Sequence, residues 1–222
     1  MDSKEVTAAV LAGGGSTRMG RNKALLKLGN KTMIERVVNP LQGIFNEILV
    51  VTNEPEQYDM LEGVRFVRDC INVEGKSSLI GLYSGLKQSE TSHIFAIACD
   101  MPFVNTGLIK YMVNLLKGED VIVPFVNTNQ NECMVNLLKN EDSAVLSSEK
   151  YYQPLHAIYG KGCIPEFEML LKRGKYKITS AFENMKTKKI TEEEIKRFDS
   201  NMLCFKNINT YEEYLQVTYF FG

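Results

Sequence analysis

Short apolar runs alternate with segments of helical periodicity along the chain. Continuous apolar runs such as "IFAIA" are typical of strands that a parallel sheet buries on both faces. The pattern predicts strands at Val6–Ala12, Glu47–Thr52, Val64–Arg68, His93–Ala98 and Val121–Pro124. It predicts helices between them at Lys31–Gly43, Gly81–Gln88 and Thr106–Lys117. We therefore expect an α/β fold, a three-layer α/β/α sandwich around a Rossmann-like, mostly parallel sheet.

Ligands of such sheets bind at the carboxyl ends of the strands, so the loops that follow strands carry most of the functional information. The first of these loops reads "AGGGSTRMG". Its glycines allow close approach of the backbone, whose free N–H groups can bind an anion. Arg18 can contact two phosphate oxygens and Lys23 a third. The loop therefore predicts a phosphate site, and a glycine turn with solvated charges is the alternative.

The spacing of this loop excludes two familiar phosphate-binding motifs. A P-loop requires Gly-Lys followed by Ser or Thr, which "GGGSTRMG" lacks. The dinucleotide motif requires a Gly-x-Gly-x-x-Gly register and an acidic residue at the end of a second strand, and neither is present at the expected distance. The predicted phosphate site is therefore of another kind.

A second loop follows the apolar strand in "IFAIACDMPFV" and begins with Asp100. Pro102 ends strand pairing directly afterwards, so the carboxylate is held at the edge of the sheet. Magnesium commonly takes one or two carboxylates together with substrate phosphates and water. We therefore predict Asp100 as a ligand of Mg²⁺. The alternative is a helix cap, for which Asn105 and Thr106 are better placed.

A third loop places Asp69 after the predicted strand Val64–Arg68 and before a glycine-containing segment. A carboxylate can accept two parallel hydrogen bonds, as the N1–H and the exocyclic amine of guanine offer. Asp69 is therefore a candidate for reading a guanine base. On spacing alone, a surface turn is an equal alternative.

Composition limits the remaining possibilities. The 222 residues include 26 Lys and Arg against 27 Asp and Glu, so the net charge of −1 gives no basic field for nucleic acid or an anionic membrane. No apolar run approaches the length of a membrane span. The five cysteines are an odd number without paired spacing, which favours reduced thiols and a cytoplasmic protein. The length suits a single domain comprising residues 1–222.

A local repeat interrupts this domain. The segment "PFVNT" at Pro102–Thr106 recurs at Pro124–Thr128, and "MVNLLK" at Met112–Lys117 recurs at Met134–Lys139, each 22 positions later. This similarity predicts a tandem-duplicated insert at about residues 125–146. The second copy has lost part of its apolar helical face and should not belong to the core. A passive surface insertion and a lid beside the site are both open interpretations.

Together these motifs resemble a known family. "LAGGGSTRMGRNKALL" resembles the signature of nucleotidyltransferases that activate sugars, isoprenoid precursors and pterin cofactors. "CDMPF", "QPLHAIYGK" and "FKNINTYEEY" narrow the resemblance to the molybdenum cofactor guanylyltransferases. The resemblance covers nearly the whole chain except the duplicated insert. It implies a GT-A-like domain that joins GMP from Mg·GTP to molybdopterin and releases pyrophosphate, with molybdoenzymes or their chaperones as further partners.

The resemblance also assigns residues. It implies that the nucleotide is held by Leu11, Ala12, Gly13, Gly14, Lys23, Asn53 and Asp69, and Mg²⁺ by Asp100. It places His156, Asn207 and Asn209 toward the pterin. Arg18, Lys23 and Asp100 would supply the charge neutralisation that phosphoryl transfer needs without a protein nucleophile. A phosphate monoester is already ionised near neutral pH, so His156 is as readily a structural residue as a base.

Two departures from the family pattern bear on these assignments. Asn22 stands where the family often has aspartate before the signature lysine, which could change how Lys23 is held. The insert precedes "PLHA" on the acceptor side, so the acceptor is less well defined than the nucleotide. A related nucleotidyltransferase that uses CTP or another acceptor, and a nucleotide-binding regulatory protein without turnover, therefore stay as alternatives.

Overall fold

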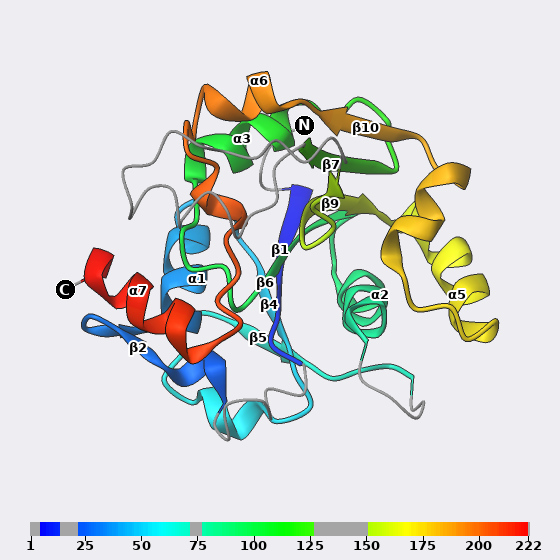
Figure 1. Ribbon diagram of the computed structural model, residues 1–222. Coiled ribbons are helices and arrows are strands. Elements are labelled where there is room, and N and C mark those ends of the chain that lie inside the picture. The colour runs from blue at the N-terminus through cyan, green and yellow to red at the C-terminus, as the bar shows by residue number, and fades with distance from the viewer. Residues whose placement is uncertain (1–4, 14–21, 72–76, 127–150, 222) are drawn as a thin grey trace.

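The computed structural model describes residues 5–13, 22–71, 77–126 and 151–221. An eight-stranded sheet with helices on both faces runs through the middle of the molecule (Figure 1). The strand order is β10-β7-β9-β6-β1-β4-β5, with β8 paired to β7. These strands are β1 Val6–Leu11, β4 Ile48–Val51, β5 Arg65–Val67, β6 His93–Ala98, β7 Val121–Val126, β8 Tyr151–Tyr152, β9 His156–Gly160 and β10 Thr187–Ile190. The predicted α/β class with a mostly parallel sheet is confirmed.

The half of the sheet that contains β1 is entirely parallel. β1 pairs in parallel with β4 on one side and β6 on the other, and β4 pairs in parallel with β5. Every residue of β1 is buried, which explains its continuous apolar sequence. The other half departs from the parallel pattern, because β9 runs antiparallel between β6 and β7. The sequence pattern did not predict β9 or the parallel edge strand β10.

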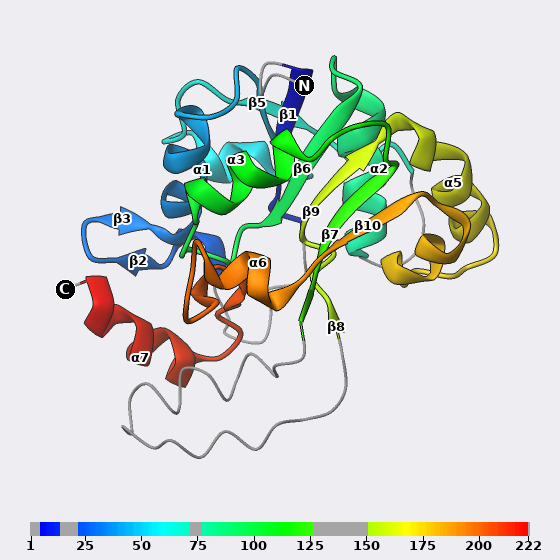
Figure 2. The ribbon, with the colours of Figure 1, turned by 90° about the horizontal axis from the view of Figure 1, so that it is seen from above.

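Helices α1 (Met33–Gln42), α3 (Thr106–Asn114) and α6 (Glu192–Lys196) cover one face of the sheet, and α2 (Ser78–Gln88) and α5 (Ile164–Lys172) cover the other (Figure 2). Their apolar stripes pack on alternate residues of the strands and form two core clusters separated by the sheet. Two of the predicted helices begin at strong caps. Thr32 and Glu35 form a capping box at α1, and Asn105 caps α3 by accepting from the N–H of Leu108 at 2.9 Å.

The C-terminal segment packs beside the N-terminal hairpin. Helix α7 (Tyr211–Phe221) lies against the hairpin of β2 (Lys27–Leu28) and β3 (Lys31–Thr32), through a small cluster of Leu28, Met33, Ile208 and Val217. The described 3₁₀ helices are η3 Lys23–Leu25, η4 Pro55–Tyr58, η5 Lys161–Cys163, η6 Ile178–Asn184 and η7 Leu203–Phe205. Within the described ranges, no helix is long and apolar enough to cross a lipid bilayer.

The duplicated insert begins inside a strand. Phe125 and Val126, at the start of the second repeat copy, belong to β7 and pair with Tyr152 and Tyr151 of β8. The strand is therefore two residues longer than predicted. The helix expected around residues 131–139 lies outside the described residues.

Candidate active site

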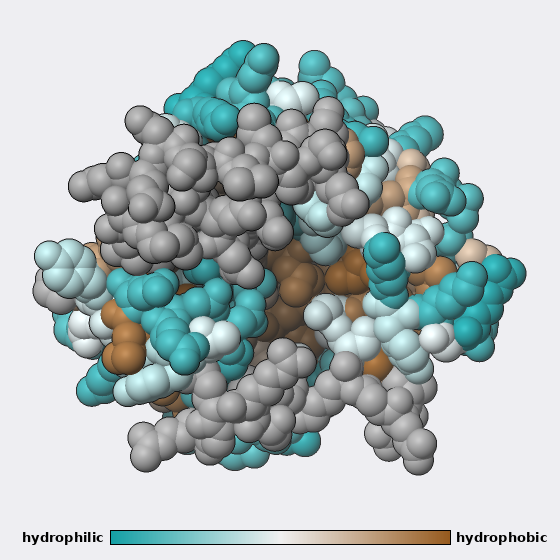
Figure 3. Space-filling view, viewed as in Figure 1, coloured by the Kyte–Doolittle hydropathy of each residue, from teal (hydrophilic) through white to brown (hydrophobic). Residues whose placement is uncertain are grey.

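The three predicted loops and the turn that carries Asn53 meet at one edge of the sheet. Gly13 follows β1, Asn53 follows β4, Asp69 follows β5 and Asp100 follows β6. The chain leaves β1 toward β4 and β5 on one side and returns to β6 on the other, which makes β1 a topological switch point. Crevices at such points bind ligands in open α/β sheets. Figure 3 shows that the middle of one face of the molecule is hollowed and that apolar residues form its floor.

The described start of the glycine loop is fixed by its neighbours. The N–H of Ala12 donates to the carbonyl of Val51 at 2.9 Å, and the N–H of Cys99 donates to the carbonyl of Leu11 at 3.2 Å. Gly13 is exposed, and a Cβ there would lie 3.8 Å from the Val51 oxygen, which is ordinary contact. Gly14 and Arg18, which we predicted to bind the nucleotide, lie outside the described residues.

Lys23 points inward at this edge. It is 9% exposed, and its Nζ donates to the backbone carbonyl of Asn209 at 2.5 Å. The preceding Asn22 caps η3 by accepting from the N–H of Ala24 at 3.1 Å. Its Nδ2 donates to Gln57 at 2.6 Å and to Tyr58 at 2.9 Å. Asn22 therefore fixes the turn that carries Lys23, and it does so with an amide donor that aspartate lacks.

Tyr58 is a supporting residue that the sequence analysis missed. It is 1% exposed, and its hydroxyl donates to the carbonyl of Ala12 at 3.3 Å while accepting from Asn22. Burial raises the pKa of Tyr58 to about 12, so the hydroxyl stays a donor. In the sequence, Tyr58 is marked only by being an aromatic residue within the otherwise polar turn after β4.

The structure brings Asn53 and Asp69 together. Asn53 Nδ2 donates to Asp69 Oδ2 at 2.8 Å, and the N–H of Asp69 donates to Asn53 Oδ1 at 3.1 Å. The loop after Asp69 is held by Ser84, whose hydroxyl accepts from the N–H of Cys70 at 2.8 Å. Each carboxylate oxygen has two lone pairs, so Asp69 can accept further hydrogen bonds while it is held by Asn53.

Asp100 is mostly buried and incompletely satisfied. Its Oδ1 is inaccessible to solvent and has no hydrogen-bond partner among the described residues. Burial raises the pKa of Asp100, and the negative charge of Glu213 adds to this effect, whereas the positive charge of Lys23 opposes it. A cation beside Oδ1 would satisfy this oxygen and stabilise its ionised form. No group of three or more His, Cys, Asp or Glu in the described chain could hold a metal, so a metal here would need substrate oxygens as further ligands.

Of the three residues expected to face the pterin, His156 does not. It is 0% exposed and lies edge-on between Phe95 and Phe205, with ring centroids 5.2 and 5.1 Å away. Burial lowers the pKa of His156 to about 3, opposed by the more distant charge of Asp199, and neither ring nitrogen has a partner in the described structure. His156 is therefore a neutral core residue, and the expectation of an acceptor contact is wrong because the antiparallel strand β9 turns its side chain inward.

Asn207 and Asn209 lie beside residues that we predicted to bind the nucleotide and the metal. The carbonyl of Asn209 accepts from Lys23, and the N–H of the intervening Ile208 donates to the carbonyl of Asp100 at 3.0 Å. Asn207 Oδ1 is buried without a partner among the described residues. The side chain of Asn207 can therefore take a further donor, whereas Asn209 acts through its backbone.

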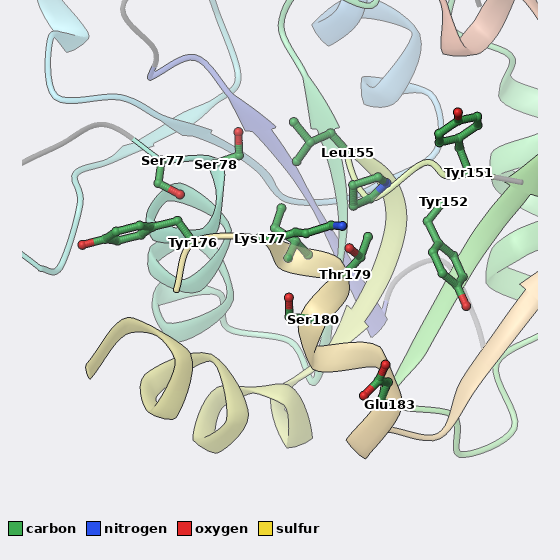
Figure 4. A pocket seen from close by; sticks show the side chains of 12 residues that line it. Ser77, Ser78, Tyr151, Tyr152, Leu155, Tyr176, Lys177, Thr179, Ser180 and Glu183 are labelled. Atoms are coloured by element: carbon green, nitrogen blue, oxygen red, sulfur yellow. The ribbon is translucent and has the colours of Figure 1, made fainter. Parts of the chain in front are cut away.

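A separate pocket with a volume of about 710 Å³ opens on the α2 side of β9. Figure 4 shows that the Lys177 side chain extends into the middle of it, toward Leu155 and Thr179. Ser77 and Ser78 at the start of α2 form one side, and Tyr151 and Tyr152 of β8 form another. The pocket thus combines aromatic walls, hydroxyl groups and one flexible cation, and the sequence analysis did not predict it.

A Rossmann-like sheet with a lysine, an aspartate and a carboxylate–amide pair at its switch point defines a nucleotide-binding α/β protein. The family model for the MobA-like NTP transferase domain matches residues 8–188. The chain belongs to this family and is thus a nucleotidyltransferase.

Individual relatives support the same assignment. The chain is 33% identical over 220 residues to a probable molybdenum cofactor guanylyltransferase of Natranaerobius thermophilus, covering 98% of this chain and 97% of the relative. It is 32% identical to a protein of the same description from Peptoclostridium acidaminophilum, with 96% and 89% covered. Molybdopterin-guanine dinucleotide biosynthesis protein A from Archaeoglobus fulgidus shares the fold, with a TM-score of 0.73, 23% identity and 96% and 97% of the two chains covered.

The fold alone does not select the nucleotide. The 2-C-methyl-D-erythritol 4-phosphate cytidylyltransferase of Thermus thermophilus shares it with a TM-score of 0.70 at 13% identity, covering 97% of this chain and 98% of that one. The nucleotide therefore has to be inferred from the side chains of the site.

Proposed function

We propose that this nucleotidyltransferase transfers GMP from GTP to molybdopterin, releases pyrophosphate and uses Mg²⁺ as its cofactor in the cytoplasm. The observation that carries the proposal is the incompletely satisfied Asp100 at the switch point, within electrostatic reach of the positive charge of Lys23. The carboxylate of Asp69, held by Asn53, lies at the same edge of the sheet. The names of the relatives, which are guanylyltransferases of the molybdenum cofactor, support the same reaction.

Guanine recognition is assigned to Asp69. Its carboxylate would accept the N1–H and the exocyclic amine of guanine, two parallel donors that cytosine does not offer in this arrangement. Asn53 supports this role because it donates to Oδ2 and orients the carboxylate. The glycine loop and Arg18 would bind the phosphates, as the sequence predicts.

Asp100 would hold Mg²⁺ through the oxygen that lacks a protein partner. When bound, the ion would supply neutralisation of the charge on the GTP phosphates. A lone carboxylate suffices because magnesium keeps substrate oxygens and water as its other ligands. The buried Asp100 is ionised most readily when a cation is present, so nucleotide and metal should bind together.

The transfer itself requires no protein nucleophile. A terminal phosphate oxygen of the pterin forms a bond to the α-phosphorus of GTP, and the bond from that phosphorus to the bridging oxygen of the β-phosphate breaks. Pyrophosphate leaves with the electron pair of this bond. Lys23 supplies a positive charge near the phosphates. No base is needed for an ionised phosphate, and the buried His156, with a pKa lowered to about 3, does not provide one.

The acceptor would occupy the pocket around Lys177. Its aromatic residues suit a flat heterocycle, and Lys177 suits an anionic group. Tyr151 and Tyr152, which line the pocket, form strand β8. This strand follows the insert closely in the sequence. Molybdoenzymes or their chaperones would receive the product.

The test is a pyrophosphate-release assay with molybdopterin and each of GTP, CTP, ATP and UTP in Mg²⁺, together with the shift in melting temperature that each nucleotide causes. We expect turnover with GTP and the largest thermal shift from GTP. In the Asp69→Ala variant, the guanine preference should disappear while a weaker general nucleotide effect stays. Turnover with CTP equal to that with GTP would contradict the assignment to guanine. Nucleotide binding without pyrophosphate release would indicate a regulatory protein.

A further inference from the structure

We infer that the buried Lys206 and the partly buried Glu213 form a positioning pair that sets the place of Lys23 for the donor nucleotide. The inference rests on the proposed function, because it deepens the account of the same nucleotide site. Neither residue touches the substrate in this assignment. Both act through the backbone of residues 208–210.

Lys206 and Glu213 lie in direct contact, with the lysine buried and the glutamate partly buried. Lys206 is 4% exposed, and its Nζ lies 3.0 Å from Oε1 of Glu213, whose side chain is 16% exposed. Removing Lys206 from this pair would leave the negative charge of a partly buried glutamate uncompensated, which is unfavourable. The two residues are seven positions apart, so the ion pair closes the short segment that lies between them.

Glu213 anchors this segment with its second oxygen. Oε2 accepts from the N–H of Asn209 at 2.6 Å and from the N–H of Thr210 at 3.0 Å. In return, the hydroxyl of Thr210 accepts from the N–H of Glu213 at 3.1 Å, which completes a capping box at the start of α7. Burial alone would raise the pKa of Glu213, but the backbone donors of Asn209 and Thr210 together with Lys206 hold this pKa below its usual value.

The backbone of residues 208 and 209 also contacts residues of the proposed nucleotide site. The carbonyl of Asn209, whose N–H is held by Glu213, accepts from Lys23 Nζ at 2.5 Å. The N–H of Ile208 donates to the carbonyl of Asp100. A shift of this segment would therefore move the phosphate-binding ammonium and the metal-binding loop together.

Lys206 also balances charge. Without Lys206, the negative charge of Glu213 would oppose the approach of the GTP phosphates. A capping box alone needs no lysine, because its two bonds are made by Thr210 and Glu213.

The experiment measures the Kd of GTP in Mg²⁺ by calorimetry, at a temperature well below each variant's melting point. Lys206→Met should weaken GTP binding roughly tenfold, because the partly buried carboxylate of Glu213 then lacks its positive partner. Adding Glu213→Gln should restore the Kd to within about threefold of the original, because glutamine serves in a capping box and carries no charge. Lys196→Met, which breaks the surface pair with Glu192 at 3.7 Å, is the matched control and should change nothing.

A second comparison avoids any folding defect of the single variant. Lys206→Met/Glu213→Gln and Lys206→Met/Glu213→Ala both lack buried charge, and only the first retains an acceptor for the Asn209 and Thr210 N–H groups. We expect roughly tenfold weaker GTP binding in the alanine variant. Equal Kd values for the two double variants, or an unchanged Kd in a folded Lys206→Met, would overturn the inference.

The outcomes separate this inference from the proposed function. Should the unaltered protein bind CTP or ATP better than GTP, the guanylyl assignment fails, and the same variants are then compared with the nucleotide that binds best. Should GTP bind best while the variants behave alike, the positioning pair fails and the proposed function stands.

Discussion

The two halves of the site are built differently. The proposed nucleotide half is built mainly of residues that follow the four parallel strands β6, β1, β4 and β5. The proposed acceptor half consists of the two-residue strand β8, the 3₁₀ helix η6 and the first turn of α2. Parallel strands bring their carboxyl ends to one edge, so the first half follows from the order of strands. The second half depends on how an antiparallel strand and short helices pack, which no local pattern encodes.

We expect the largest effect from a substitution in the proposed nucleotide half. Asp100→Asn should lower kcat by at least roughly two orders of magnitude, on the scale of losing a main electrostatic stabiliser. The fold should persist, because the substitution removes a buried charge with an unpartnered oxygen. Steady-state pyrophosphate release and the melting temperature check both statements.

Asp59→Asn is the control, because Asp59 is exposed and lies outside the site. Near-normal activity of Asp100→Asn across a magnesium titration would show that the metal is held elsewhere.

The next largest effect is expected from a substitution in the proposed acceptor half, and it tests whether the two halves bind different substrates. Lys177→Met should raise the KM of molybdopterin roughly tenfold and leave the Kd of GTP unchanged, because Lys177 lies in the pocket apart from the nucleotide residues. Lys175→Met is matched in charge and exposure but lies outside the pocket lining. A changed Kd for GTP with an unchanged acceptor KM would assign the pocket to the donor.

The sequence predicted the first half because several signals agreed there. The apolar strands were continuous, and polar residues such as Asp69 and Asp100 came directly after them. The first helix begins later than expected, because Lys31 and Thr32 form a hairpin strand. The second helix begins at Ser78, three residues before the predicted start, because Ser77 caps it. These are boundary effects, and they leave the site in place.

The remaining parts could not be predicted for physical reasons. "HAIYG" reads equally as a helix turn or a strand, and only its pairing between β6 and β7 fixes His156 inward. The contact between Lys23 and Asn209 joins residues 186 positions apart, and it depends on α7 packing against the β2–β3 hairpin. Arg18 and Gly14 lie outside the described residues, so their phosphate contacts stay predictions.

A smaller effect distinguishes a core histidine from a site histidine. The pKa of His156 is lowered to about 3 from 6.5, so between these values the unfolded chain binds a proton that the folded chain does not. Stability should therefore fall as the pH drops from about 6.5 toward 3. His156→Leu should reduce this slope and raise stability at pH 7 by about 1 kcal/mol, because two unpartnered buried nitrogens are removed.

Melting curves at several pH values test this, and activity at pH 7 should be retained. His93 is the only other histidine, and burial lowers its pKa as well while interactions with Glu119, Asp120 and Glu5 oppose the shift. His93→Gln should therefore change the slope less than His156→Leu does. If the dependence of stability on pH were unchanged in His156→Leu and turnover were lost, His156 would instead belong to the acceptor site.

The smallest effect concerns the duplicated segment, and the structure changes how it should be removed. A deletion of residues 125–146 would take Phe125 and Val126 out of β7, although Val126 is 1% exposed and pairs with Tyr151. Deleting the equally long range 127–148 keeps both residues. Glu149 and Lys150 would then connect Val126 to Tyr151 as a two-residue hairpin loop. Glu149→Asn and Lys150→Gly supply the residues that such a turn prefers.

This variant should fold and bind GTP as before. Each doubling of loop length costs about 0.6 kcal/mol, so shortening the connection stabilises the chain by at most about 2 kcal/mol and raises Tm by a few degrees. The β7–β8 pair stays intact, so the Lys177 pocket should keep its tyrosine wall and the acceptor KM should change less than about threefold. Melting temperature, GTP binding and guanylyl transfer are measured together. A much higher acceptor KM with unchanged Tm and GTP binding would show that the segment is a working element of the acceptor half, whereas a collapse of Tm would place its second copy in the core.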